Sequence, residues 1–344
     1  MRRMLNTLFV TTQGAWISQK GENIIVHLNK EESKAFPIHL FESILCFGQV
    51  NVTAPAMGFC AEHGVNLAFF TEYGKFIARV QGPVHGNVLL RREQYRIADS
   101  DEKCAPLVRN ILLGKLLNSK IVLQRFLRDH RQDPDSEKHI KNTCALLDSY
   151  ILQIKHLSSI NELRGIEGIA AKNYFDLFDL MIIQQKEDFR FIGRNRRPPT
   201  DNVNAMLSYV YTLLAHDVTS ALESVGLDPA VGFLHTDRSG RPSLALDLME
   251  EFRTWLADRF VLSLINMKQV RAKGFTLTPS GAVEMNEDTR KMVIAEWQSR
   301  KQDEITHPFT GEKMQIGNLA YLQSMLLARY IRGDIKEYPP FVWR

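Results

Sequence analysis

The strongest constraint on the fold is a change of hydrophobic period near residue 85. Before it, short apolar or alternating runs are separated by turn residues, which is typical of β-strands. From Leu89 onward, apolar residues recur every three or four positions, which is typical of amphipathic helices. We therefore predict an α+β protein, with a sandwich-like β domain over 1–85 followed by a larger all-helical domain over 86–344.

Turn and breaker residues refine this division. The predicted strands are, in chain order, LNTLFV, AWISQ, NIIVHL, FPIHL, SILCFG, VNLAFF and KFIARV. One helix is expected over 53–64, and a small hairpin over 274–286 interrupts the helical part. Segment 81–87 contains two glycines and a proline, which indicates a hinge. An amphipathic helix is expected over 316–333, with Gly333 as its stop.

Composition narrows the function only slightly. A chain of 344 residues fits two domains, and a net charge of +4 permits nucleic acid as a partner without requiring it. No apolar run approaches the roughly 20 residues of a membrane span, and the N-terminus does not fit a signal peptide. The four cysteines lack metal-site spacing. We expect a soluble cytoplasmic protein with reduced thiols and no membrane partner.

Carboxylates occur in a segment that otherwise predicts a buried helix, LHTDRSGRPSLALDLMEEFRTWLADRF (234–260). At roughly 100° per residue, one broad apolar face comprises Leu244, Leu248, Phe252, Trp255 and Leu256, and a second stripe carries Asp247, Glu251 and Asp258. Glu250 lies one turn from Asp247, and His235 precedes a turn that can fold it back toward the helix. Two carboxylates and an imidazole suit Mg²⁺ or Mn²⁺. On spacing alone, a solvated helix face and a structural histidine are the commoner outcome.

A further acid falls on the apolar side of a predicted helix. In LRGIEGIAAKNYFDLFDLM (163–181), Glu167 shares a stripe with two alanines and two aromatic residues. An acid on such a stripe needs a partner, because an unpaired buried charge is costly. The alternative is a first-turn acid stabilised by the helix dipole.

Two basic clusters are candidates for phosphate contacts. Arg194, Arg196 and Arg197 precede two prolines and a helix start near Thr200-Asp201, where a helix N-terminus can hold phosphate. Arg91 and Arg92 belong to RREQYR (91–96), in which a tyrosine interrupts the arginines. Ordinary exposed surface is the alternative for both clusters.

Taken together, these segments resemble one known family. The motifs are EGIAAKNYF, RNRRPPTDNVNAMLSYVY and GFLHTDRSGRPSLALDLMEEFR, preceded by GPVHGNVLLRREQY. In this order they are similar to the CRISPR-associated spacer integrases, the DNA-integrating proteins of CRISPR adaptation. The form of the third motif resembles that of type I systems, subtype C. The resemblance covers essentially the whole chain.

The resemblance implies a fold, a site and partners. The family has an N-terminal β domain, a C-terminal helical catalytic domain and a homodimeric assembly that works with a small ferredoxin-like partner protein. It implies metal ligands at Glu167, His235 and Glu250, with Asp247 as a supporting acid, and Mg²⁺ or Mn²⁺ as the ion. DNA is the expected substrate, both as a short duplex and as the CRISPR repeat. Arg241 joins the five arginines above as a candidate DNA contact.

The leading hypothesis is therefore a metal-dependent DNA integrase and endonuclease. A DNA 3′-hydroxyl would attack a repeat phosphodiester, with Glu167, His235 and Glu250 holding the ion. Asp247 would orient His235 or an outer-shell water. One alternative is a dimeric DNA-binding scaffold whose carboxylates are structural. Another is a helical interaction protein with no role at nucleic acid.

Overall fold

The computed structural model describes residues 7–29, 31–41, 43–72, 76–80, 82, 88–195 and 198–343. The chain divides into two compact units. The first comprises 1–86 with 290–304 and 315–318, and the second comprises 87–289 with 305–314 and 319–344. Most of the predicted hinge, 81–87, lies outside the described residues.

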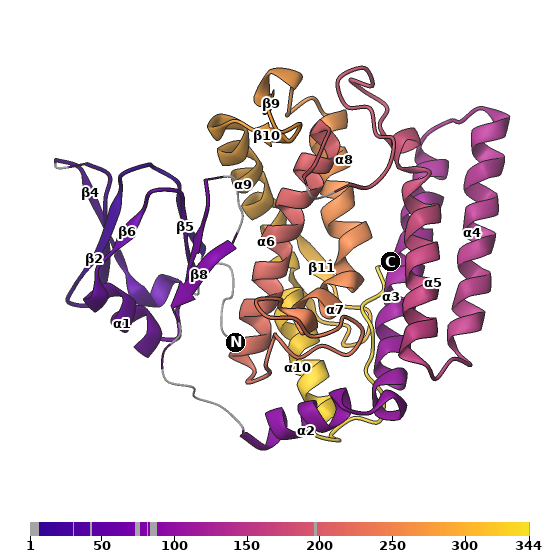
Figure 1. The fold of residues 1–344 in the computed structure, drawn as a ribbon, viewed down its shortest axis with the longest axis horizontal. Helices are drawn as coiled ribbons and strands as arrows, with labels where there is room; N and C mark the ends of the chain where they lie inside the picture. The colour runs from indigo at the N-terminus through magenta and orange to yellow at the C-terminus, as the bar shows by residue number, and fades with distance from the viewer. Residues whose placement is uncertain are drawn as a thin grey trace. The chain divides into compact units, whose positions relative to one another are not determined.

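The described part of the first unit contains two four-stranded sheets (Figure 1). The strand bounds are β1 Thr7–Val10, β2 Trp16–Lys20, β3 Asn23–His27, β4 Ser33–Pro37, β5 Ser43–Phe47, β6 Asn51–Val52, β7 Asn66–Phe70 and β8 Phe76–Val80. One sheet has the order β1-β5-β7-β8 and the other β4-β3-β2-β6. Strand β5 is parallel to both β1 and β7, whereas β3 is antiparallel to both β2 and β4.

The core of this unit collects apolar side chains from both sheets. Ile17 and Ile24 of one sheet join Ile44 and Leu67 of the other in a single buried cluster. Helix α1 (Ala54–Glu62) contributes Ala56 to the same cluster and packs against β2 and β7. Such a shared core is that of a sandwich, as predicted.

Two local predictions in this unit had different outcomes. Helix α1 begins after Thr53, whose side chain accepts from the Ala56 amide, and the chain leaves it through Gly64 at φ +67°. The predicted strand FPIHL is wrong in its second half. Strand β4 ends at Pro37, and residues Ile38–Leu40 form a 3-10 turn, η1. Proline cannot donate to a sheet ladder, which explains why the strand stops there.

The second unit is mostly helical, as predicted. Its helices are α2 Val88–Ala98, α3 Asp101–Asp129, α4 Pro134–Ile154, α5 Ile160–Phe175, α6 Asn202–Ser224, α7 Ser243–Phe252, α8 Arg259–Asn266 and α10 Leu319–Ile331. Its short turns are η2 Phe178–Met181, η3 Arg253–Asp258 and η4 Ala272–Gly274. A further short turn, η5 Ile316–Asn318, belongs to the first unit. Helix α9 (Glu287–Gln302) belongs to the first unit from Arg290 onward.

The remaining strands are short. They are β9 Phe275–Leu277, β10 Val283–Met285, β11 Glu304–Thr306 and β12 Lys313–Gln315. Strands β9 and β10 pair antiparallel, which confirms the predicted hairpin. Helix α10 confirms the predicted amphipathic helix, and Gly333 follows it at φ +81°.

Helix α3 is the axis of the helical unit. It packs against α4, α5, α7 and η3, and Figure 1 shows α4 and α5 running beside it. The C-terminal segment also lies along α3, where the Asn118 side chain donates to Phe341 O and accepts from the Trp343 amide. Helices α5 and α7 thus both pack on α3. Among the described residues, no helix has the length and apolar character that a bilayer crossing requires.

Candidate active site

The carboxylates of α7 are buried. Asp247, Glu250 and Glu251 are 0%, 2% and 0% exposed. The interpretation of these acids as a solvated helix face is therefore wrong. Helix α7 packs against both α3 and α6, so its polar side as well as its apolar side is covered by protein. Acids in such positions need compensating charges or donors.

Glu250 is held by two cations from two helical segments. Its Oε1 pairs with Arg253 Nη1 at 2.6 Å, and its Oε2 pairs with Lys115 Nζ of α3 at 2.7 Å. Burial alone would raise the pKa of Glu250, but the charges of Arg253, Lys115 and His235 lower that pKa to about 2. Glu250 is therefore ionised at any physiological pH.

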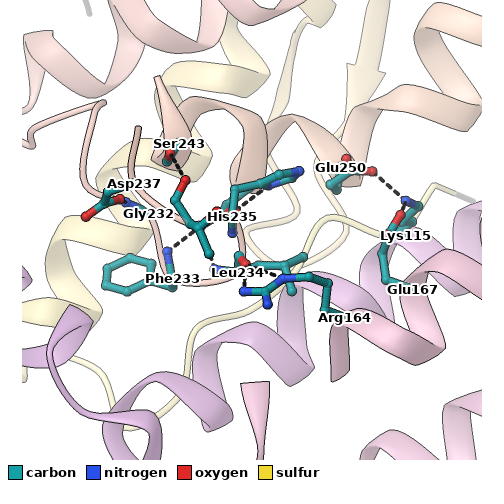
Figure 2. A network of polar contacts seen from close by, with 12 residues as sticks. Lys115, Arg164, Glu167, Gly232, Phe233, Leu234, His235, Asp237, Ser243 and Glu250 are labelled. Carbon is teal, nitrogen blue, oxygen red and sulfur yellow. Dashed lines mark hydrogen bonds and ion pairs between the residues drawn. The ribbon is translucent and has the colours of Figure 1, made fainter. Parts of the chain in front are cut away.

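Glu167 forms an ion pair with the same lysine. It lies in the middle of α5, which begins at Ile160 after the N-cap Ser159, so the first-turn interpretation is wrong. Glu162 occupies the first turn instead. The ammonium of Lys115 forms an ion pair with Glu167 Oε1, and Figure 2 shows the lysine beside both glutamates. Two carboxylates from different helices thus share one cation.

His235 is folded back onto α7 by a loop that Asp247 holds. Asp247 accepts hydrogen bonds from the amides of Phe233, Leu234 and His235, at 2.5 to 2.9 Å. Its Oδ1 also lies 2.7 Å from His235 Nδ1. Because the same carboxylate accepts from the backbone amides, Nδ1 is assigned as a donor to Asp247, and Nε2 is the ring nitrogen that Asp247 does not contact. Asp247 orients the histidine and fixes its tautomer.

Two neighbouring residues secure this loop. Arg164 of α5 donates to Leu234 O through Nη2 at 2.7 Å and through Nε at 3.2 Å. Gly232 permits the close approach of the loop to the start of α7, because a Cβ there would lie 2.7 Å from Ser243 Cβ. The loop is therefore tied to both helices that carry the candidate ligands.

The three predicted ligands come from α5, α7 and the loop before α7. Figure 2 shows the His235 ring pointing toward Glu250, and the histidine is near enough for its charge to lower the pKa of Glu250. Within the described ranges, no group of three or more His, Cys, Asp and Glu side chains is arranged to hold a metal ion. The donor types nevertheless suit Mg²⁺ or Mn²⁺. The Lys115 ammonium is the cation that pairs with both glutamates in this structure.

The comparison with known proteins identifies the family. The family model described as CRISPR associated protein Cas1 matches residues 8–299. The chain belongs to the Cas1 family. A CRISPR-associated endonuclease Cas1 of Chlorobaculum tepidum is 53% identical over 344 residues, which are all of both chains. A second Cas1 endonuclease, of Rhodospirillum rubrum, is 47% identical over 347 aligned positions and is also covered completely. The family resemblance inferred from the motifs is confirmed, and subtype C stays a prediction.

Solved structures show that the Cas1 fold extends to distant relatives. A casposase bound to its integration product has a TM-score of 0.83 at 23% identity, over 97% of this chain and 93% of that one. A Cas1 protein from Thermotoga maritima has a TM-score of 0.81 at 23% identity, over 95% and 97%. A chain of a Cas6-RT-Cas1–Cas2 complex has a TM-score of 0.82 at 21% identity, over 98% of this chain and 36% of that one.

Sequence reasoning missed Lys115 and Arg253, the two cations of this Cas1 site. A signal for Lys115 is present in the sequence. It follows Ile111 and Leu112 by four and three positions and precedes Ser119 by four, all of them buried on α3. A lysine on the buried stripe of a helix indicates an acid from another element. Arg253 has a weaker signal, since Glu-to-Arg spacings of three residues are common on exposed helices.

A second buried network adjoins Glu250. Arg253 begins the π-helical turn η3, and its guanidinium lies 4.5 Å from the ring centroid of Tyr211. The Tyr211 hydroxyl donates to Asp258, which is also buried. Burial raises the pKa of Asp258 to about 6, against the lowering effects of the Tyr211 hydrogen bond and of Arg253. π-Helical turns occur frequently at functional sites, and this one places Arg253 against Glu250.

The predicted DNA-binding arginines have different environments. The Arg194 guanidinium donates hydrogen bonds to two side chains of α6. Its Nη1 donates to Asn204 Oδ1 at 2.6 Å, and its Nη2 donates to Ser208 Oγ at 3.1 Å. The helix itself begins after the N-cap Asp201, as expected. Arg241 is partly buried in the turn before α7. Arg196 and Arg197 lie outside the described residues.

The other basic cluster lies on helix α2. Arg92 is exposed and Arg91 is partly buried. The tyrosine between the arginines already has a partner, since the Tyr95 hydroxyl donates to Asp228 Oδ2 at 2.8 Å. Gln94 is buried and bonds the backbone of Asp228 and Val231. The polar side of α2 therefore anchors the loop before α7, and its arginines remain candidates for DNA contact.

Proposed function

We propose that this chain is a metal-dependent DNA integrase and endonuclease that inserts short foreign DNA into a CRISPR array. The observation that carries the proposal is the pair Glu167 and Glu250, which converge on one cation from two helices beside a histidine with a fixed tautomer. The relatives, which are CRISPR-associated endonucleases, support it. The casposase of the same fold, bound to its integration product, supports the integrase half.

The reaction is a transesterification at phosphorus. A DNA 3′-hydroxyl attacks a repeat phosphodiester, a new P–O bond forms, and the bond to the original 3′-oxygen breaks with a proton transferred to it. A bound Mg²⁺ or Mn²⁺ supplies a Lewis acid for the phosphoryl oxygen and lowers the pKa of the attacking hydroxyl. If water attacks in place of the hydroxyl, the same site cleaves DNA, so one site accounts for both activities.

The residues of the chain have separate roles in this proposal. Glu167, Glu250 and His235 Nε2 would hold the ion, and Asp247 keeps the imidazole in the required tautomer and orientation. Arg253 holds Glu250 by Oε1 and so leaves Oε2 directed toward the shared cation. Arg92 on α2, together with Arg91, Arg194, Arg196, Arg197 and Arg241, would contact DNA phosphates.

The proposal includes an assembly. A Cas1 homodimer working in the cytoplasm would present two such sites, and a small ferredoxin-like partner would hold the dimers on DNA. The Cas6-RT-Cas1–Cas2 complex, which contains a chain of the same fold, supports the expectation of a partner protein. The N-terminal sandwich is the proposed dimerisation element.

A strand-transfer assay on branched DNA tests the function. The wild-type protein is incubated with Mn²⁺, Mg²⁺ or EDTA, with and without the small partner. Joined product is expected only with a divalent ion. Product in EDTA would exclude the metal-dependent mechanism.

One observation favours the scaffold as a second candidate. Lys115 and Arg253 already compensate the charge of Glu250, so this buried carboxylate does not require a metal ion as its partner. A scaffold would bind DNA in EDTA and would change no phosphodiester bond under any of the three conditions. Phosphate contacts would still make its DNA affinity fall steeply with salt.

A further inference from the structure

Lys115 has an unusual position for a lysine. Its side chain is only 5% exposed, and its ammonium contacts Glu167 of α5 and Glu250 of α7. Lysines normally keep their ammonium group in water and bury only the stem. At this site, by contrast, the ammonium itself is buried, and it forms ion pairs with two carboxylates from different helices.

The packing around Lys115 fixes this arrangement. Gly114 precedes it, and a Cβ at that position would lie 3.3 Å from Glu251 Cγ and 3.2 Å from Phe341 O. The absence of a side chain lets α7 and the C-terminal segment lie close against α3. At this separation, the Lys115 side chain reaches Glu250 at 2.7 Å.

The charges of the site indicate what an added ion would do. Its ion pairs contain three carboxylates, Glu167, Glu250 and Asp247, and two permanent cations, Lys115 and Arg253. Counting these five groups alone, one negative charge is left over. A divalent ion added beside Lys115 would leave the site with one excess positive charge. An ion that replaces the Lys115 ammonium would leave it neutral. Close like charges in a covered site repel strongly, so replacement is favoured.

We propose that Lys115 is an internal counter-cation, which holds Glu167 and Glu250 in place in the metal-free protein and competes with the divalent ion for both carboxylates. This inference rests on the proposed function, because it assumes that these glutamates are ligands. Competition weakens the binding of the ion to the protein alone. A DNA phosphate offers the displaced ammonium a new partner, so DNA and ion bind cooperatively, each strengthening the other by the same factor.

A Mn²⁺ titration measures the competition directly. Free Mn²⁺ is followed by electron paramagnetic resonance with wild type, Lys115→Met and Lys115→Gln, each with and without branched DNA. Both variants should bind Mn²⁺ on the order of tenfold tighter than wild type without DNA. Their affinity should gain less from DNA than that of wild type. A Lys115→Met/Glu250→Ala double variant should lose this binding, which identifies the titrated site.

Lys120→Met is the matched control. Lys120 lies on the same helix, and its ammonium bonds Asp148 of α4 at 2.6 and 2.8 Å. Its removal deletes an ion pair of α3 without touching either glutamate. Its Mn²⁺ affinity should equal that of wild type. A tightening as large as that of Lys115→Met would overturn the proposal, because general loosening of α3 would then be the cause.

Thermal unfolding supplies a readout independent of affinity. Without the ammonium, Glu250 and Glu167 lose their shared partner, so Lys115→Met should unfold at a lower temperature than wild type in EDTA. Mn²⁺ should raise its midpoint more than it raises that of wild type. Variants that stay unfolded even in Mn²⁺ would contradict the inference, since an ion in the same position should replace the lost charge.

The two proposals fail in different ways. If neither wild type nor any variant binds Mn²⁺ with or without DNA, the metal-dependent function itself is wrong. If wild type and the two Lys115 single variants bind it with equal affinity and the double variant does not, the function stands and only the role of Lys115 is refuted. Weaker binding by the Lys115 variants would also refute it, because Lys115 would then be supporting the ligands rather than competing with the ion.

Discussion

Glu250 and Glu251 are neighbours on α7, are equally buried and have opposite electrostatic environments. Glu250 faces Lys115 and Arg253, and these charges overcome burial to hold its pKa at about 2. Glu251 faces hydrogen-bond donors without a full charge, namely Gln323 Nε2 and the Phe341 amide, each 2.8 Å from its Oε2. Burial therefore raises its pKa to about 8, although these donors and Tyr338 oppose the shift.

The difference separates two uses of a buried acid. An ionised carboxylate held between cations can exchange one cation for another, which a metal site requires. A protonated carboxyl group in a neutral network joins chain segments, here α7, α10 and the C-terminal segment. Because burial is the same for both, the identity of the partners decides the role. We therefore predict a functional role for Glu250 and a structural role for Glu251.

The largest expected effect tests this division by activity. Glu250→Gln removes a charge from the proposed ion site, whereas Glu251→Gln replaces a carboxyl group that is already neutral at pH 7. Strand transfer by Glu250→Gln should fall on the order of 10³-fold, since a bound ion contributes several kcal/mol to the transition state. Glu251→Gln should retain activity within a few-fold. Equal losses in the two variants would mean that α7 tolerates no substitution here.

The second effect is the pH dependence of stability. Glu251 has a pKa of about 8 in the folded protein and an ordinary value near 4.5 when unfolded, so the folded state binds the extra proton between these values. Its contribution is fully present below pH 4.5 and is lost as the pH rises toward 8. Each unit of pKa difference is about 1.4 kcal/mol. The free energy of unfolding of wild type should therefore fall over this range relative to Glu251→Gln.

Urea unfolding at pH 5, 6, 7 and 8 checks this prediction. The difference between wild type and Glu251→Gln should change steadily with pH, by a few kcal/mol in all. Glu250→Gln is the control, because its group is ionised throughout this range and cannot titrate in it. Parallel curves for wild type and Glu251→Gln would show that Glu251 is ionised in the folded protein.

Much of the fold was predictable from the sequence. The change from alternation to helical period correctly separated strands from helices, and Gly64 and Gly333 correctly marked two helix ends. These features depend on neighbours in the chain. The turn η3 was not predictable. Residues 243–260 fit one continuous helix at 100° per residue, but a π-helical turn interrupts it at Arg253–Asp258.

The site was predicted only in part, for a similar reason. Glu167, His235, Asp247 and Glu250 stood out through their motifs and lie near one another. Their partners did not stand out, because the contacts of Lys115 join residues 52 and 135 positions away in the chain. Whether a buried acid is charged depends on these distant partners. Periodicity can show that Glu250 and Glu251 are unusual, but cannot distinguish them.

A smaller effect is expected when one of the two cations at Glu250 is removed. Arg253→Met leaves Lys115 as the charged partner, so the pKa of Glu250 should rise toward its ordinary value. A depressed carboxyl pKa contributes stability that is present above the unfolded value and is lost as the pH falls through the folded one. The acid-induced loss of stability should therefore be smaller in the variant and should be complete at a higher pH. Arg253→Met should also cost about 3 kcal/mol at pH 7.

Acid titration of the unfolding midpoint, from pH 6 to pH 3, measures the shift. Arg128→Met is a suitable control, because Arg128 pairs with Asp129 in an exposed position on α3, away from Glu250. An acid limb at the same pH in wild type and Arg253→Met would show that Lys115 alone maintains the charge of Glu250.

The smallest effect sharpens the description of Glu251. The Tyr338 hydroxyl accepts from Gln323 Nε2 at 2.6 Å, and its hydrogen bond to Glu251 lowers the pKa of that acid. Tyr338→Phe removes this donor, so the pKa of Glu251 should rise further and the alkaline loss of stability should move to higher pH. The variant should lose about 1 kcal/mol at pH 6, the usual net value of one hydrogen bond. Strand transfer should not change, because Glu250 keeps both cations. The same urea series, extended above pH 8, measures the shift. A loss of strand transfer in Tyr338→Phe would show that the two carboxylates are coupled through α7 rather than independent.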